Sequence, residues 1–265
     1  MATETDTFVT DVAFGQEVIA TTVTSSGAAV EGWIQEIRAA LGDLVVGLDV
    51  EWRPSYSPSQ NPVALLQLCV GRRCLIFQLL HADFVPQALS AFLADPALRF
   101  VGVGVREDVE RLIDDHDLTV ANTVDLRAVA VEAMQRPELR QAGLQALARA
   151  VMGADAATLQ KPQRVRMGPW DAYCLSLVQI KYACIDAFVS FEVGRKLLTG
   201  DLPLPPAPEM YLHIGWERFA RYHRLQAIFV LVFSYFGDRD ISVKVFDETR
   251  CRQHYRGDID EEDDD

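Results

Sequence analysis

Two carboxylates stand close together in an otherwise apolar segment. Residues 44–52 read LVVGLDVEW, a composition typical of a buried β-strand, yet they include Asp49 and Glu51. Residues two apart on a strand project from the same face, so the two side chains are expected to lie side by side. Paired carboxylates repel each other and are costly to desolvate unless a cation neutralises them. The pair predicts a Mg²⁺ or Mn²⁺ site, since these ions prefer oxygen ligands; solvated acids at a strand end are the alternative.

A third carboxylate, Asp108, follows a short apolar strand predicted over 100–105. A helix is expected to begin near Glu107, which places Asp108 in the first helical turn, facing back over the end of the strand. An acid in a first turn also favours the helix dipole, so Asp108 alone is explained as a helix-start residue.

A late helix predicted over 176–198 carries Tyr182 and Asp186, which are four residues apart and therefore share one face. Their neighbours on that face include the apolar Val189. A hydroxyl and a carboxylate among apolar residues need polar partners. The alternative is a buried tyrosine beside a surface aspartate.

Taken in order, these residues resemble the DEDDy type of 3′–5′ exonuclease. That family carries Asp-x-Glu on a strand, Asp at a helix start and Tyr-x-x-x-Asp on a late helix. Within that family, the sequence is most similar to the Werner-type exonuclease domains and their stand-alone plant relatives. The similar segments are LDVEW, VALLQLCV, GVGVREDVERL, RVRMGPWDAYCLS and IKYACIDAFVSFEVGRKL. The similarity covers roughly residues 8–200 and does not extend to 209–265. It implies a ribonuclease H-like (DnaQ-like) α/β fold, with a mixed β-sheet flanked by helices.

The resemblance also implies an activity: two Mg²⁺ or Mn²⁺ ions per site support hydrolysis of nucleic acid from a free 3′ end to 5′-mononucleotides. By the same resemblance, Asp49, Glu51 and Asp186 hold the first ion. Asp49 also binds the second ion, which Asp108 supports. The hydroxyl of Tyr182 orients the attacking water.

Four further residues are candidates for binding the substrate. Trp52 follows the carboxylates directly, where it could contact the terminal nucleotide or belong to the core. Lys161, Arg164 and Arg166 fall in a basic, proline-containing loop predicted over 161–169. In the resembled family this region lies near the substrate groove, so phosphate contacts are expected; a solvated loop is the alternative.

Hydrophobic periodicity predicts the elements that position these residues. A hairpin over 8–24 is followed by strands that alternate with helices, which indicates a mixed α/β sheet. Gly102 and Gly104 fall within the strand predicted over 100–105, and without a third glycine they do not form a dinucleotide site. The expected elements are a helix over 29–41, strands over 44–52, 63–70 and 73–78, a helix over 86–94, a strand over 123–125 whose Asp125 caps the next helix, and a helix over 141–152.

A proline-rich segment predicts the domain division. We expect an exonuclease domain over 1–200, a linker over 201–208, an extension of unknown role over 209–257 and a disordered acidic tail over 258–265. The extension contains one expected helix near 216–231, and 209–265 could bind a protein partner.

The net charge of −13 over 265 residues argues at first against binding of nucleic acid. The charge is unevenly distributed, because residues 31–200 carry 17 basic and 20 acidic residues and the acids are concentrated at the two ends. The four candidate metal ligands account for the excess within 31–200. With those ligands neutralised by metal, we expect weak, salt-sensitive binding rather than none.

The first residues are polar and acidic and lack the pattern of a secretory signal. The longest apolar run, 228–236, is too short for a bilayer span of about 20 residues. The five cysteines include no CxxC pair, which argues against a disulfide framework. We expect no membrane association and no secretion; the resemblance implies the nucleus, with the cytosol as the alternative.

The sequence leaves three functions open: a DNA exonuclease, an RNA exonuclease and a protein-interaction module. DNA is favoured as the substrate, but the same chemistry would serve an RNA exonuclease of the ribonuclease D type, since recognition of the 2′-OH depends on groove shape. A protein-interaction module that retains the nuclease fold is the third reading. The resembled proteins also leave self-association into a homo-oligomer open.

Overall fold

The computed structural model describes residues 7–40, 45–55, 60–153 and 159–201, together with 230–235 and 241–246. Contacts divide the chain into two units, residues 1–204 and 205–265. The predicted roles of 1–200, 201–208, 209–257 and 258–265 stay predictions.

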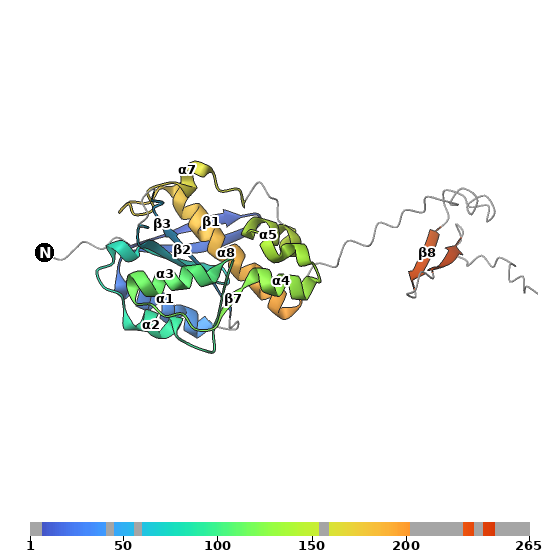
Figure 1. Cartoon of the computed structure of the whole chain (residues 1–265), viewed down its shortest axis with the longest axis horizontal. Helices are drawn as coiled ribbons and strands as arrows, with labels where there is room; N and C mark the ends of the chain where they lie inside the picture. The colour runs from blue at the N-terminus through green and yellow to red at the C-terminus, as the bar shows by residue number, and fades with distance from the viewer. Residues whose placement is uncertain are drawn as a thin grey trace, which may run out of the picture. The chain divides into compact units, whose positions relative to one another are not determined.

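The first unit is built on a seven-stranded mixed sheet (Figure 1). Its strand order is β1-β2-β5-β4-β3-β6-β7. The pairs β1–β2, β5–β4 and β4–β3 are antiparallel, whereas β2–β5, β3–β6 and β6–β7 are parallel. The expected mixed sheet is therefore confirmed. The strands are β1 (Thr7–Phe14), β2 (Glu17–Thr24), β3 (Val45–Trp52), β4 (Val63–Val70), β5 (Arg73–Phe77), β6 (Arg99–Gly102) and β7 (Thr123–Asp125).

Helices cover both faces of this sheet, and each face has its own apolar core. Along β3, Val46, Leu48 and Val50 pack with the first group of helices, and Val45 packs with the second. This alternation is what a strand buried on both faces requires. The first group is α1 (Gly27–Ala40), α2 (Gln87–Leu93) and α3 (Val105–His116); the second is α4 (Leu126–Met134), α5 (Leu144–Met152) and α8 (Leu177–Thr199).

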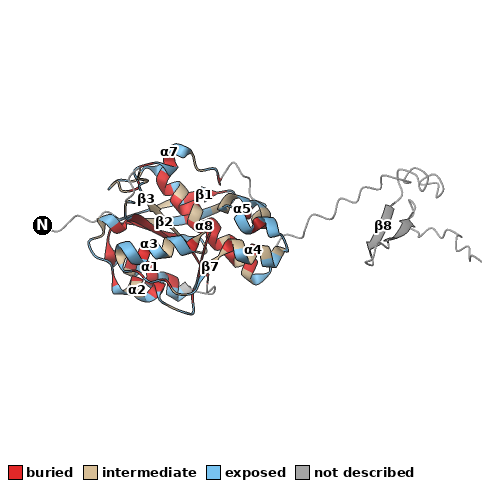
Figure 2. Ribbon diagram, in the orientation of Figure 1, coloured by how far each residue is buried: buried red, intermediate tan, exposed pale blue. Residues whose placement is uncertain are grey.

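The long helix α8 lies against the centre of the sheet and is buried over much of its length (Figure 2). Its start is fixed by a capping box, in which Ser176 and Gln179 satisfy each other's backbone amides. The helix approaches β3 so closely at Gly47 that a Cβ there would overlap the carbonyl oxygen of Ala187 and the backbone of Phe191. Glycine at this position therefore brings the carboxylates of the strand close to those of the helix.

Two expected boundaries differ in the structure. The strand expected over 100–105 ends at Gly102, and Gly104 is instead the N-cap of α3 with a φ of 72°. Glycine adopts that left-handed conformation readily because it has no Cβ, so the apolar run breaks there and α3 begins at Val105. The segment expected as a loop over 161–169 contains a short helix, α7 (Gln163–Arg166).

The expected helix over 141–152 begins later, at Leu144 of α5, and a separate 3₁₀ turn, η2 (Pro137–Gln141), precedes it. Asp125 caps α4 as expected, because its side chain accepts a hydrogen bond from the amide of Arg127. Among the described helices, none combines the length and apolarity needed to cross a bilayer.

In the second unit the described residues form an antiparallel pair of strands, β8 (Val230–Tyr235) and β9 (Ile241–Phe246). The helix expected near 216–231 is wrong at its end, because β-branched and aromatic residues from Val230 onward favour a strand. Its remainder, 216–229, lies outside the described residues, as do 202–208 and the tail 258–265.

Candidate active site

Strand β3 supplies two of the acidic side chains. Asp49 and Glu51 alternate with the buried Leu48 and Val50, so both project from the face of the sheet that packs against α8. A register shift between Glu51 and Trp52 interrupts the pairing with β4 at this point. The strand therefore delivers both acids to the α8 face just before its regular pairing breaks.

Helix α8 brings Asp186 against this pair. One carboxylate oxygen from each of Asp49, Glu51 and Asp186 lies within 4.8 Å of the others. All three residues are half-buried, so their charges are only partly screened by water. The two segments that sequence analysis linked are thus brought together, and we call these three residues the carboxylate cluster.

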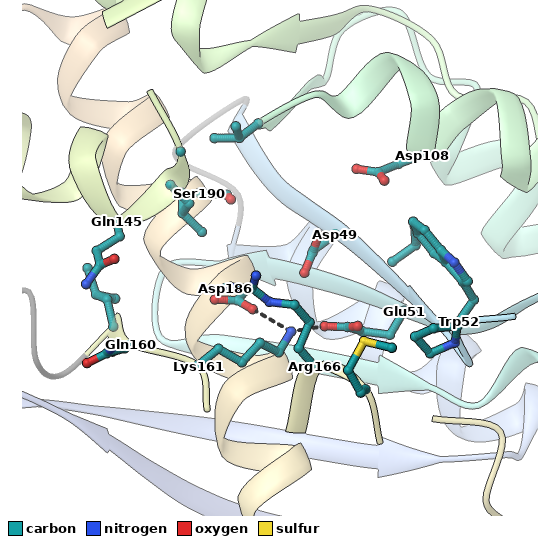
Figure 3. Close-up of a pocket in the computed structure, with 17 residues that line it drawn as sticks. Asp49, Glu51, Trp52, Asp108, Gln145, Gln160, Lys161, Arg166, Asp186 and Ser190 are labelled. Carbon is teal, nitrogen blue, oxygen red and sulfur yellow. Dashed lines mark hydrogen bonds and ion pairs between the residues drawn. The ribbon is translucent and has the colours of Figure 1, made fainter. Parts of the chain in front are cut away.

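Asp108 stands on α3, opposite the carboxylate cluster, and lines the same cavity (Figure 3). It follows the left-handed turn at Gly104 and lies in the first turn of the helix, as expected. Among the described residues, the acids whose carboxylate oxygens lie within 4.8 Å of one another are the three of the carboxylate cluster, and Asp108 is not one of them.

Burial raises the pKa of each acid. For Asp49, burial and then the charges of Asp186 and Glu51 hold the pKa well above its ordinary value. Burial raises the pKa of Glu51 to about 7 although Lys161 opposes the shift, and burial together with Glu107 raises the pKa of Asp108 to about 7. The charged forms of these acids are therefore destabilised until a cation is present.

A positively charged side chain of the protein, Lys161, lies against the carboxylate cluster. The ammonium group of Lys161 donates hydrogen bonds to Glu51 and to Asp186, the second at 3.0 Å (Figure 3). The side chain of Lys161 is 13% exposed, and its nitrogen lies 4.9 Å from the ring centroid of Trp170. Burial alone would lower the pKa of Lys161, but Asp186 and Glu51 outweigh it and raise that pKa above its ordinary value. The expected solvated-loop alternative is therefore wrong for this lysine.

The carboxylate cluster has the donor chemistry that a hard divalent cation requires. It offers only carboxylate oxygens, at the separation that one ion spans, and it already attracts a positive group. Asp49, Glu51 and Asp186 fit the expected Mg²⁺ or Mn²⁺ ion, and Lys161 stands in for its charge.

A cavity of about 830 Å³ extends from the cluster. Of the four candidate substrate-binding residues, Trp52, Lys161 and Arg166 line it, whereas Arg164 is exposed and borders a separate depression of about 280 Å³. The substrate-binding roles of all four stay predictions.

Tyr182 lies outside the described lining of the cavity. Its hydroxyl donates a hydrogen bond of 2.9 Å to the carbonyl oxygen of Gln160, the residue before Lys161. The tyrosine thus holds the backbone from which Lys161 reaches the carboxylate cluster. Its expected role toward a water molecule stays a prediction.

Several residues of the site were not anticipated. The guanidinium of Arg111 lies 4.0 Å from the ring centroid of Trp52 and donates to the carbonyl oxygen of Asn61 at 2.5 Å. No pattern in the sequence pairs a residue of α3 with one of β3. The polar side chains that line the cavity beyond those expected are Gln145, Gln160 and Ser190.

Comparisons with known proteins cover the first unit. The model of a family described as 3′-5′ exonuclease matches residues 21–199. A 3′-5′ exonuclease of Arabidopsis thaliana is 33% identical over 169 residues, which span 63% of this chain and 56% of that protein. The bifunctional 3′-5′ exonuclease/ATP-dependent helicase WRN of Mus musculus is 32% identical over 163 residues, which span 61% of this chain and 11% of that protein. The chain thus spans little more than half of the first relative and a small part of the second.

A solved structure adds a likeness of fold. Escherichia coli RNase D, described as an exoribonuclease involved in structured RNA processing, is 18% identical with a TM-score of 0.55. The match covers 67% of this chain and 44% of the other. At this identity the likeness shows the fold alone, and it confirms the expected ribonuclease H-like architecture.

Proposed function

Since this chain belongs to the 3′–5′ exonuclease family, as its resemblance predicted, we propose that it hydrolyses nucleic acid from a free 3′ end and releases 5′-mononucleotides. The observation that carries the proposal is the carboxylate cluster, in which Asp49, Glu51 and Asp186 converge within 4.8 Å at the wall of a cavity. Three acids held together at a cost in desolvation are explained by a cation-dependent reaction on an anionic substrate.

The proposed site is of the DEDDy type and uses Mg²⁺ or Mn²⁺. Asp49, Glu51 and Asp186 would hold one ion, and Asp49 with Asp108 would hold a second. Bound there, such ions lower the pKa of water and neutralise charge on the reacting phosphate. The raised pKa values of these acids support the assignment, because a cation returns them to the charged form.

The chain's other residues complete the reaction. The hydroxyl of Tyr182 donates to the carbonyl oxygen of Gln160, so its own oxygen remains able to accept a hydrogen bond from the attacking water. Lys161 and Arg166 bind phosphate oxygens of the strand, and Trp52 contacts the terminal nucleotide. Trp52, Lys161 and Arg166 line the cavity, and Tyr182 is bonded to Gln160, which lines it as well.

We propose DNA as the substrate and the nucleus as the place of action, on the similarity to the Werner-type relatives. RNA is the competing substrate, since the carboxylate chemistry is the same and sugar discrimination depends on contacts to the 2′-OH. Matched DNA and RNA strands of one sequence, digested in parallel, separate the two by their kcat/KM.

The function is tested with 5′-end-labelled single strands, duplexes with recessed 3′ ends, and RNA. We expect stepwise shortening from the 3′ end with Mg²⁺ or Mn²⁺, none with EDTA, and 5′-mononucleotide products. Asp49→Asn and Asp186→Asn should abolish shortening, whereas Asp11→Asn, at an exposed position of β1, should not.

Two outcomes would overturn this proposal. One is resistance of every substrate to the wild-type chain with either ion, which would favour the interaction-module alternative. The other is full activity of Asp186→Asn, which would remove the carboxylate cluster from the reaction.

A further inference from the structure

One polar side chain is buried in strand β4 without any hydrogen-bond partner. Gln67 interrupts the apolar sequence VALLQLCV, its exposed fraction is 0%, and both Nε2 and Oε1 lack a partner among the described residues. A buried amide left unsatisfied destabilises the folded chain, because it has lost its hydrogen bonds to water. Such a group calls for an explanation that packing alone does not provide.

The register of the sheet places Gln67 directly opposite Asp49. The two residues are cross-strand partners in the antiparallel pairing of β3 with β4, so their side chains leave the sheet on the same face. That face is the one covered by α8, because the flanking Leu65 and Cys69 pack in the same core as the helix. Gln67 thus lies beneath α8, next to the first acid of the carboxylate cluster.

We propose that Gln67 is a positioning residue for Asp49. Directly opposed side chains have Cβ atoms about 4.5–5.5 Å apart, a span that a glutamine amide crosses by side-chain rotation. Nε2 of Gln67 would donate a hydrogen bond to the carboxylate of Asp49. The proposal rests on the proposed function and deepens it, because it states how the acid expected to bind both ions is oriented.

The chemistry of an amide suits this position. A lysine would compete with a divalent ion for the Asp49 carboxylate, as Lys161 does at Glu51 and Asp186. A further acid would add repulsion to a cluster in which neighbouring charges already raise the pKa of Asp49. A neutral donor orients the carboxylate without either effect, and ligating carboxylates are commonly held by such donors.

The test is Gln67→Met, which keeps the length of the side chain and removes its donor. The matched control is Leu65→Met, a fully buried position on the same strand and face, opposite Glu51. Mn²⁺ affinity is measured by the EPR signal of free Mn²⁺, stability by thermal melting in EDTA, and turnover on an end-labelled strand.

We expect Gln67→Met to weaken Mn²⁺ binding about 10–100-fold and to slow turnover, while its melting temperature in EDTA stays level or rises because a buried unpaired amide is gone. Leu65→Met should keep wild-type Mn²⁺ affinity. Unchanged Mn²⁺ affinity in Gln67→Met, or an equal loss of affinity in Leu65→Met, would overturn the role of Gln67 and leave the nuclease assignment standing. Absence of Mn²⁺ binding and of turnover in the wild-type chain would overturn the nuclease assignment itself, and the role of Gln67 with it.

Discussion

The ammonium group of Lys161 donates a hydrogen bond of 3.0 Å to the carboxylate of Asp186. The same nitrogen is paired with Glu51, so a lysine 25 residues before Asp186 and 110 residues after Glu51 neutralises part of the carboxylate cluster. A divalent ion that binds these two acids must displace this lysine. Metal binding and the position of Lys161 are therefore coupled.

Replacing Lys161 should strengthen metal binding. In Lys161→Met the competing cation is absent, and since a charged hydrogen bond contributes about 1.5–3 kcal/mol, we expect Mn²⁺ to bind about 10-fold more tightly or better. Titration at pH 8 by EPR measures the affinity. The control is Lys181→Met, an exposed lysine of α8. Unchanged or weaker Mn²⁺ binding in Lys161→Met would show that the lysine does not compete.

Two arginines of α7 should differ in their contribution to substrate binding. Arg166 lines the cavity and Arg164 does not, so Arg166→Met should lose a phosphate contact that Arg164→Met keeps. Fluorescence anisotropy with a single-stranded oligonucleotide, in the Asp186→Asn background, measures affinity against salt. We expect the slope of log affinity on log salt to fall by about 0.7 for Arg166→Met alone. Equal slopes for the two variants would argue against a contact specific to Arg166.

Removing the hydroxyl of Tyr182 should separate turnover from metal binding. Tyr182→Phe loses the hydrogen bond to the carbonyl oxygen of Gln160 and the proposed contact to water, but none of the carboxylates. We expect kcat to fall about 100-fold or more, with Mn²⁺ affinity close to that of the wild-type chain. A wild-type kcat would exclude the hydroxyl from the reaction.

The metal-free protein should lose stability as the pH rises toward neutrality. The folded pKa of Glu51 and of Asp108 is about 7, above the ordinary values of 4.5 and 3.8, so the folded state retains protons that the unfolded chain releases. The resulting stabilisation is complete below the unfolded values and is lost as the pH passes through about 7.

Thermal melting in EDTA between about pH 5.5 and pH 8.5 measures this dependence. Glu51→Gln should make it shallower, since the amide does not titrate whereas Asp108 still does, and Mn²⁺ should restore the melting temperature of the wild-type chain at high pH. Identical slopes in the wild-type chain and Glu51→Gln would show that Glu51 contributes nothing to the effect.

Local patterns in the sequence predicted most strands and helices of the first unit and the faces on which the acids lie, whereas the grouping of the acids into one site came from the family resemblance. Alternation along β3 placed Asp49 and Glu51 on one face, and the spacing of Tyr182 and Asp186 placed both on one helix face. Both periodicities follow from the geometry of the strand and helix backbone, so the side chains lie on the predicted faces in the structure.

The contacts between distant segments could not be predicted in the same way. Lys161 was expected in a loop near the substrate groove, where it would contact phosphate, yet its ammonium group pairs with Glu51 on a strand 110 residues away. The stacking of Arg111 on Trp52 joins α3 to β3. Such contacts depend on tertiary packing and on side-chain direction, and neither produces a periodic pattern of residues from which the contact could be predicted.

The close approach of α8 to β3 at Gly47 has a consequence for how this chain tolerates variation. A methyl group at that position would overlap the backbone of Ala187 and Phe191, which would push the helix outward and carry Asp186 away from Asp49. Position 47 holds no reactive atom, yet even alanine there should be as damaging as the loss of an acid. In a library of all single substitutions selected for activity, Gly47 should therefore tolerate as few replacements as Asp49 and Asp186, although it takes no part in the reaction.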